Sequence, residues 1–385
     1  MSNLKQYEIA ISQFIPLEER SLYFYWKGRV ALFALLRAIG LKEQDDVVLP
    51  GLTCVVVPNA ILYLGARPVY VDVSVKTCNA TFEAIIAAVT DRTKAIIVQN
   101  TFGLSSDVDR ISSWAKERGI YTIEDCTHGF GGTFNGKPNG SYCDAAIYST
   151  QWNKPYSTGV GGFCIVSNKT LNAKLVHVNK ELLMPTLLEN VQLRFLLLLH
   201  KYLLSNSTYW ILLHLYRFLS KIGLVIGSSS GEEIQGISMP KYYFKGASPV
   251  QFNEGIGKIK RLGVVLEHRR KNAHKYTAIL SANGKYHVDS ALNDNHSFLK
   301  YPILVKNRAD FIKKAERCKI KLGDWFISPL HPANSPLDAW LIDEKHIPNA
   351  TFLANHLLNL PTDEINVEPV LNFINSNIDD FLDFR

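Results

Sequence analysis

Residues 123–132 read IEDCTHGFGG, and residues 144–162 read DAAIYSTQWNKPYSTGVGG. In both stretches a short apolar run is followed by polar side chains of the kinds found in active sites. The first run leads to Asp125, and the second leads to Ser149, with Lys154 five residues further on. Runs of this length predict buried strands, and open α/β sheets bind ligands at the carboxyl ends of their strands. We therefore expect a ligand site at these strand ends.

A lysine close to an acid and a histidine suits carbonyl chemistry. We expect the fold to bring Lys154 near Asp125 and His128. Burial there lowers the pKa of the amine and leaves it nucleophilic, which a Schiff base requires. Each residue alone has a simpler explanation, because an acid at a strand end often caps a helix and a surface lysine is often only a solvated charge. Together with the glycine-rich turn 159–162 they favour a catalytic site.

In order and spacing these residues resemble the nucleotide-sugar aminotransferases of the DegT and StrS group, which are fold-type-I enzymes that depend on pyridoxal 5'-phosphate. The family pattern reads roughly E-D-x-x-[HQ]-x-x-G, followed by S-x-x-x-x-K-x-x-[ST]-[ST]-G-x-G-G. The chain matches it with Glu124 to His128 and with Ser149 to Gly162. The likeness extends over about residues 20 to 370, with a weak patch at about 170 to 245.

The resemblance implies a role for each of these residues. Lys154 would form the Schiff base with the cofactor and carry the proton between carbon atoms. Asp125 would pair with the pyridine nitrogen and keep the ring an electron sink. His128 would lie near the ring hydroxyl, and Ser149 would bind the phosphate. Lys154, Asp125 and His128 are therefore the expected catalytic residues.

The phosphate loop departs from the family pattern. Where the family usually has S-G-T-A-A-L, residues 27–32 read KGRVAL, which keeps the glycine and a helix start suited to an anion. We expect Gly28, Arg29 and Val30 to bind the cofactor phosphate, with Arg29 forming a charge-assisted pair. The N-x-R-M element that reaches the neighbouring subunit's phosphate site aligns with Phe244 to Ala247, where Lys245 is a candidate substitute.

Two other positions also differ from the family. Cys54 stands where many members place an aromatic residue over the cofactor ring. The stacking is therefore lost or comes from another residue. Val160 replaces a frequent Glu in the glycine-rich turn.

Strand-like and helical stretches alternate through the first half of the chain, which predicts an α/β fold with a mostly parallel sheet, as in fold type I. Expected strands are 47–49, 69–73, 95–98, 121–123, 145–148 and 163–166, and expected helices include 29–39, 82–89 and 109–118. A long helix from Pro249 should lead into a smaller α+β domain with a strand at 299–305 and helices at about 308–318 and 367–384. We predict a large cofactor-binding domain at 1–248 and a small domain at 249–385.

Composition narrows the function classes. The chain has 385 residues, a formal net charge of +7 and 47% hydrophobic residues, which suits an enzyme with a large core. Lys and Arg are scattered rather than blocked, which argues against nucleic acid as a partner. The six cysteines form no C-x-x-C pair, so neither a metal site nor a disulfide framework is indicated. The first residues lack a secretory signal profile, and we expect a cytoplasmic protein.

An apolar insertion is expected at about residues 190–228. Its core, residues 193–226, contains two apolar runs that basic residues interrupt. Neither run reaches the roughly 20 residues that a spanning helix needs. One interpretation is a pair of amphipathic helices at the inner membrane face. The other, which we favour, is an insertion packed on the large domain or across a dimer interface.

These features predict a homodimeric aminotransferase, dependent on pyridoxal phosphate, that acts on a keto-sugar nucleotide for surface-glycan or secondary-metabolite sugars. Glutamate is the amino donor that the resemblance implies. A sugar dehydratase of the same family is an alternative, against which Lys154 argues because those members typically carry histidine there. A catalytically silent, membrane-associated scaffold of a glycan-assembly complex is an alternative from another class.

Overall fold

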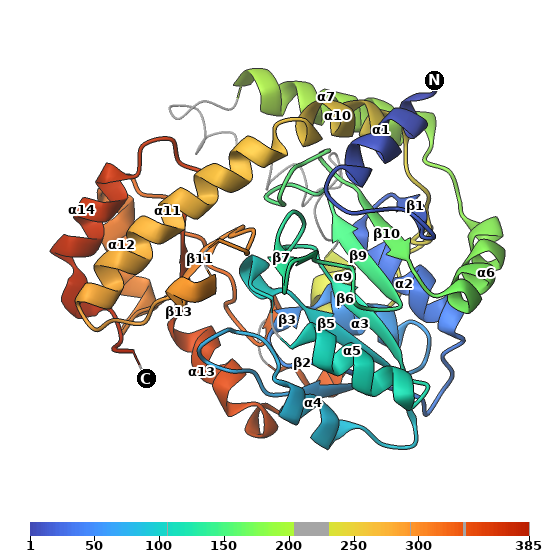
Figure 1. Cartoon of the computed structure of the whole chain (residues 1–385), viewed down its shortest axis with the longest axis horizontal. Coiled ribbons are helices and arrows are strands. Elements are labelled where there is room, and N and C mark those ends of the chain that lie inside the picture. The colour runs from blue at the N-terminus through green and yellow to red at the C-terminus, as the bar shows by residue number, and fades with distance from the viewer. Residues whose placement is uncertain (106, 204–230, 293, 334–335, 385) are drawn as a thin grey trace.

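The computed structural model describes residues 1–105, 107–203, 231–292, 294–333 and 336–384. A seven-stranded sheet forms the centre of the larger part of the molecule (Figure 1), with the strand order β1-β10-β9-β6-β5-β2-β4. Its strands are β1 (Ser21–Tyr25), β2 (Asp46–Pro50), β4 (Arg67–Val71), β5 (Thr93–Gln99), β6 (Tyr121–Asp125), β9 (Ala145–Ser149) and β10 (Gly162–Val166). β10 runs antiparallel to both neighbours, and the other neighbouring pairs are parallel. The predicted α/β fold with a mostly parallel sheet is confirmed.

Helices cover both faces of the sheet, which is why its strands read as continuous apolar runs. In β2, Val47 and Leu49 pack on one face and Val48 packs on the other. The first face is covered by α2 (Gly28–Ile39), α3 (Val56–Leu62) and α6 (Lys169–Val178), and the second by α4 (Phe82–Ala88) and α5 (Val108–Glu117).

A long helix leads from the sheet to the smaller part of the molecule (Figure 1). The sequence predicted one helix from Pro249, whereas the structure has two, α10 (Pro249–Ile259) and α11 (Leu262–Ala282), separated by a turn. A capping box of Ser248 and Gln251 starts α10, and its Phe252 packs on Tyr7 of α1 (Asn3–Ser12). Because α10 packs on the larger part, the domain boundary at 248/249 stays a prediction.

The smaller part has its own core. α11, α12 (Arg308–Arg317) and α14 (Glu368–Ser376) pack on the antiparallel pair β11 (Tyr301–Leu304) and β13 (Leu357–Leu360). The last helix was predicted to run to 384, which is wrong, because it ends at Ser376. Beyond it the chain is anchored by Phe381, whose ring packs 5.1 Å from that of Phe311, and by Leu382, whose N–H donates to the Leu304 carbonyl at 2.9 Å.

The remaining elements complete the secondary structure of the described residues. They are β3 (Thr53–Cys54), β7 (Thr133–Phe134), β8 (Lys137–Pro138), α7 (Leu187–Leu203), α9 (Gly231–Gln235), β12 (Leu330–His331) and α13 (Pro348–His356), with short 3-10 helices at Thr101–Gly103, Asn179–Glu181, Ser290–Leu292, Asp338–Trp340, Glu344–His346 and Ile378–Asp380. β12 pairs in parallel with β3 and sets His331 opposite Cys54. A segment from late in the chain therefore returns to the large sheet's ligand edge.

Only the first part of the predicted apolar insertion is described. Within α7, Leu193 and Leu196 are buried, and Leu193 packs with Trp26, Val160 and Val250 in the larger part of the molecule. This agrees with the favoured interpretation for that helix. The rest of the predicted insertion, residues 204–228, lies outside the described residues. Among the described helices, none has the length and apolar character needed to cross a bilayer.

Candidate active site

Asp125 and Ser149 end two adjacent parallel strands, β6 and β9. The register pairs Asp125 with Ile147, two residues before Ser149, so both side chains lie at the same edge of the sheet. Their exposed fractions are 4% and 8%. The backbone N–H of Thr127 donates to Oδ1 of Asp125 at 2.9 Å, which orients the carboxylate. The structure thus brings together the two strand ends that the sequence predicted to form a site.

Burial and a nearby amine act on Asp125 in opposite directions. Burial raises the pKa of this carboxyl, while the hydrogen bond from Thr127 and the charge of Lys154 lower it. A buried carboxylate gains most from a positively charged partner. Asp125 therefore suits a protonated ring nitrogen.

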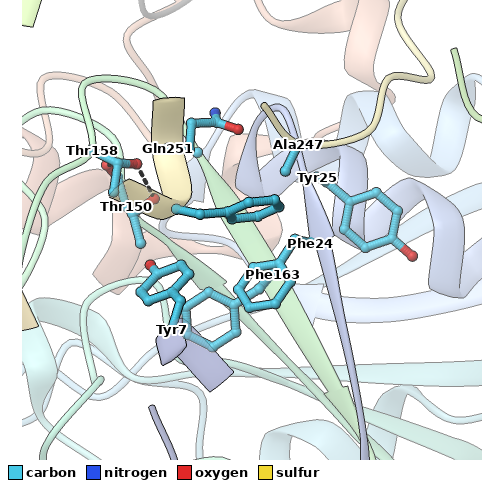
Figure 2. Close-up of a pocket in the computed structure, with 11 residues that line it drawn as sticks. Tyr7, Phe24, Tyr25, Thr150, Thr158, Phe163, Ala247 and Gln251 are labelled. Atoms are coloured by element: carbon cyan, nitrogen blue, oxygen red, sulfur yellow. Dashed lines mark hydrogen bonds between the residues drawn. The ribbon is translucent and has the colours of Figure 1, made fainter. Parts of the chain in front are cut away.

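The loop that carries Lys154 is fixed at its base by two hydroxyl groups (Figure 2). Oγ1 of Thr150 lies 2.7 Å from Oγ1 of Thr158, and Gln251 of α10 donates to a carbonyl of the glycine-rich turn at 2.8 Å. Gly161 completes this base, since a Cβ there would lie 2.2 Å from Oγ1 of Thr150. The cavity in Figure 2 has a volume of about 10 Å³, which holds one water molecule at most. The residues that line this cavity support the loop, and the cavity itself is too small to be a ligand site.

The amine of Lys154 is set up for nucleophilic chemistry. Burial lowers its pKa to about 8, against the opposing charges of Cys54 and Asp125. Its Nζ lies 4.8 Å from the centroid of the Trp325 ring, a distance at which the ring attracts a cation. About half of the amine is therefore unprotonated near pH 8, where an ordinary lysine is almost fully charged.

We expect the capture of an aldehyde by this amine to follow the lowered pKa. With cofactor-free protein and excess pyridoxal phosphate, the rate should rise with pH and reach half its maximum near pH 8, because only the neutral amine attacks. The absorbance change on mixing measures this rate. A midpoint above pH 10 would mean that Lys154 is an ordinary exposed lysine.

His128 is held as a neutral imidazole between two aromatic rings. Its ring is parallel to that of Trp325, with centroids 4.9 Å apart at 11°, and to that of Phe102, 6.3 Å apart at 16°. The N–H of Phe102 donates to Nδ1 at 3.2 Å, so the proton is on Nε2. Burial and the charge of Lys154 lower the pKa of His128 well below its usual value. His128 therefore presents Nε2–H as a hydrogen-bond donor.

The start of α2 packs against the end of β9. A Cβ at Gly28 would lie 3.1 Å from Cβ of Ser149, and a Cβ at Gly162 would lie 2.3 Å from Cα of Gly28. The helix can approach so closely because residue 162 is glycine, and the room for a side chain at Gly28 is also small. The first turn of α2, with Arg29 and Val30, therefore lies beside Ser149, and a helix N-terminus suits a phosphate.

Arg29 has a partner that the sequence did not predict. Its Nη1 lies 2.6 Å from Oε1 of Glu233 in α9, and both side chains are buried. Asn59 donates to the backbone oxygen of Glu233 at 2.8 Å and so fixes α9 at this place. The guanidinium thus uses at least one donor within the protein, and its role in phosphate binding stays a prediction.

Lys245 lies beside the start of α2 in its own chain. Its carbonyl oxygen accepts a hydrogen bond from the N–H of Trp26 at 3.0 Å, and its ammonium binds the carboxylate of Glu189. Its charge also contributes, after burial and Arg29, to lowering the pKa of Lys27 to about 8. The predicted reach of Lys245 into a neighbouring subunit is untested by these contacts.

Trp325 was missed as a site residue by the sequence analysis. It stacks on His128 and lies over the amine of Lys154, so an aromatic ring reaches the site although Cys54 occupies the family's aromatic position. The only signal in the sequence was the aromatic pair in LGDWF at 322–326. The position of this pair depends on the pairing of β12, late in the chain, with β3. Among the described residues, no group of His, Cys, Asp and Glu side chains could hold a metal ion.

A comparison of sequences identifies a family. The profile of the DegT/DnrJ/EryC1/StrS aminotransferase family matches residues 4–181 and 251–374. GDP-perosamine synthase from Escherichia coli O157:H7 is 37% identical over 150 residues, which are 39% of this chain and 41% of that protein. UDP-N-acetyl-3-dehydro-alpha-D-glucosamine 3-aminotransferase from Acidithiobacillus ferrooxidans is 37% identical over 149 residues, 38% of this chain and 40% of that protein. The chain thus matches about two fifths of the length of these relatives.

A comparison of structures covers almost the whole chain. An aminotransferase from Psychrobacter cryohalolentis superposes with a TM-score of 0.74 at 19% identity, over 98% of this chain and 91% of the other. At this identity the likeness supports the fold.

Proposed function

The chain belongs to the DegT/DnrJ/EryC1/StrS aminotransferase family, and on this premise we propose that it is an aminotransferase that uses pyridoxal 5'-phosphate to aminate a keto-sugar nucleotide. The observation that carries the proposal is an amine with a pKa of about 8, Lys154, in a loop beside the buried carboxylate of Asp125 and the neutral imidazole of His128. The names of two relatives refer to nucleotide sugars, which supports this substrate class. Glutamate is the amino donor we propose.

The residues present fit pyridoxal phosphate. A carboxylate, a neutral imidazole donor and an amine of lowered pKa lie at one sheet edge, and the N-terminus of α2, which favours an anion, packs on Ser149 at the same edge. When bound, the cofactor supplies an electron sink for the carbon that carries the amino group. We propose that Gly28, Arg29, Val30 and Ser149 hold its phosphate.

The catalytic work is then shared among three side chains. Lys154 would hold the cofactor through its amine, and the same amine, when neutral, would move the proton at the reacting carbon. Asp125 keeps the ring nitrogen protonated, because its buried carboxylate gains by pairing with a cation. His128 would offer its Nε2–H to the ring hydroxyl of the bound cofactor. Trp325 covers the amine and limits the access of water.

The test is a screen of keto-sugar nucleotides with glutamate, with products identified by mass. The proposal expects an amino-sugar nucleotide, one equivalent of 2-oxoglutarate and a visible absorbance band of the purified protein. Absence of bound cofactor and of any amino product would favour the silent scaffold. Loss of a sugar hydroxyl without amination would favour the dehydratase.

Arg29 provides a prediction about the phosphate site. The variant Arg29→Ala should weaken pyridoxal phosphate affinity by about tenfold to a hundredfold, the effect of losing a charge-assisted hydrogen bond. Because this change also removes the Arg29 partner of the buried Glu233 carboxylate, the double variant Arg29→Ala with Glu233→Ala is the control. Unchanged affinity in both variants on titration of cofactor-free protein would limit phosphate binding to Ser149 and the helix start.

We also propose that the protein acts as a homodimer and that α7 contributes to its interface. The outer side of α7 carries a helical stripe of exposed apolar residues, with exposed fractions of 54% at Val191, 57% at Phe195 and 53% at Leu198. A stripe of this kind in a soluble helix favours contact with a partner. The variant Val191→Asp with Leu198→Asp should elute as a monomer. If it stays dimeric and instead loses flotation with anionic vesicles, α7 contacts a membrane.

A further inference from the structure

Three basic side chains gather at the start of α2. Lys27 precedes the helix, and Arg29, which is 8% exposed, belongs to its first turn. Lys245, also 8% exposed, lies alongside, because its carbonyl oxygen accepts a hydrogen bond from the N–H of Trp26. Burial and the charge of Arg29 lower the pKa of Lys27 to about 8. A helix start itself carries a partial positive charge, so cations placed here need anions beside them.

Two carboxylates of the chain supply such anions. In α9, Glu233 places its Oε1 2.6 Å from Nη1 of Arg29, and the two side chains are 4% and 6% exposed. In α7, Glu189 binds the ammonium of Lys245 with a side chain that is 25% exposed. Asn59 fixes Glu233 by donating to its backbone oxygen at 2.8 Å. The pair of Arg29 and Glu233 is therefore the more deeply buried of these two ion pairs.

The same pair lies close to the reactive lysine. Burial lowers the pKa of Lys154, the charges of Cys54 and Asp125 oppose this effect, and the charge of Arg29 adds to it. Arg29 also follows directly on the glycine that packs against Ser149 at the end of β9. The guanidinium and its carboxylate partner are therefore at the edge of the sheet where the cofactor phosphate is expected.

We propose that Glu233 is an internal competitor of the cofactor phosphate: it pairs with Arg29 in the cofactor-free protein and gives up the guanidinium when the phosphate binds. The inference rests on the proposed use of pyridoxal phosphate. A buried guanidinium is costly without an anion, so the carboxylate stabilises the chain before the cofactor arrives. Arg29 stands where the family pattern has threonine, a residue that needs no counter-ion.

The competition follows from the charges of the two anions. A phosphate ester carries more negative charge than a carboxylate and offers more acceptor oxygens to the planar fork of arginine. A carboxylate that stayed at the same guanidinium would repel it. The phosphate therefore binds well only to molecules in which the pair of Arg29 and Glu233 is open, and its apparent affinity falls with the fraction that is closed.

The test compares variants that change the charge of Glu233 but keep its shape. Glu233→Gln is measured in the wild-type background and together with Arg29→Gln. Glu181→Gln is the matched control, because Glu181 lies 2.6 Å from Arg37 at the other end of α2 with an exposed side chain. Calorimetry of cofactor-free protein gives the affinity for three probes, which are pyridoxal phosphate, pyridoxal without the phosphate, and inorganic phosphate.

The proposal expects Glu233→Gln to raise the affinity for pyridoxal phosphate and for inorganic phosphate by about tenfold to a hundredfold. The affinity for pyridoxal and the affinities of the control should not change. With Arg29→Gln already present, the second change should bring no rise, because the two groups then no longer compete. Glu233→Asp, which withdraws the carboxylate by one methylene group, should give a smaller rise and replaces Glu233→Gln if that variant does not fold.

An unchanged or weaker phosphate affinity in Glu233→Gln overturns the proposal and makes Glu233 a fixed support of Arg29. An equal rise in the background without Arg29 overturns it too, since the effect would then be one of overall charge. If the wild-type protein forms no adduct with pyridoxal phosphate but Glu233→Gln binds inorganic phosphate more tightly, the internal competition stands and the proposed function fails.

Discussion

Replacing Lys154 by alanine should abolish amino transfer, with a loss of about a thousandfold or more, while the fold stays intact. No other described group shares its combination of a lowered pKa with a place beside Asp125 and over Trp325, and a positioned proton carrier and nucleophile contributes at least this much. The measurement is the release of 2-oxoglutarate from glutamate. Lys154 lies in a loop outside the helices and strands, so truncation should leave the far-ultraviolet circular dichroism unchanged.

Lys116→Ala is the matched control for this variant. Lys116 lies exposed on α5, on the covering layer of the sheet, away from the strand ends. It should keep the wild-type rate. Turnover by Lys154→Ala within tenfold of wild type would remove Lys154 from the mechanism.

Replacing Asp125 by asparagine should have the second largest effect, a loss of about a hundredfold to a thousandfold in rate with the cofactor still bound. The amide keeps the shape and can still accept the hydrogen bond from Thr127, but it carries no charge to hold the ring nitrogen protonated. The loss of one preorganised electrostatic contact commonly costs this much. The contacts of the phosphate and of Lys154 are unchanged, so cofactor affinity should fall far less than the rate.

The measurement is the single-turnover rate with glutamate, together with the cofactor content of the purified variant. Asp144→Asn is a control. Asp144 precedes β9, at the end of the strand opposite Ser149 and away from Lys154, and its carboxylate accepts hydrogen bonds from the N–H of Thr122 and the side-chain amide of Asn168. A normal rate in Asp125→Asn would mean that this carboxylate only orients the turn after β6.

The strand ends were predictable because local pattern determines them. Continuous apolar runs mark β6 and β9, and helices that alternate with strands elsewhere in the first half indicate a mostly parallel sheet, in which Asp125 and Ser149 end at one edge. The connection between β6 and β9 itself carries β7 and β8 and no helix. The family pattern added Lys154 and His128. The break between α10 and α11 and the early end of α14 were missed, because helical periodicity continues past both points and tertiary contacts decide where each helix stops.

The rest of the site depends on contacts between distant segments. Arg29 and Glu233 are 204 residues apart, and no local signal pairs them. Trp325 reaches His128 only because β12 returns to β3. In the sequence, Arg269 is one of several basic residues in the run 268–271 of a predicted helix. Only the folded structure shows that it is buried beside Pro155.

The most direct test of the central claim is to identify the residue that holds the cofactor. Wild-type protein is incubated with pyridoxal phosphate, treated with borohydride, digested and analysed by peptide mass spectrometry. We expect one phosphopyridoxyl group per chain, on Lys154, and its loss when glutamate is added before the borohydride. A modification that maps to another lysine, or none at all, would contradict the account.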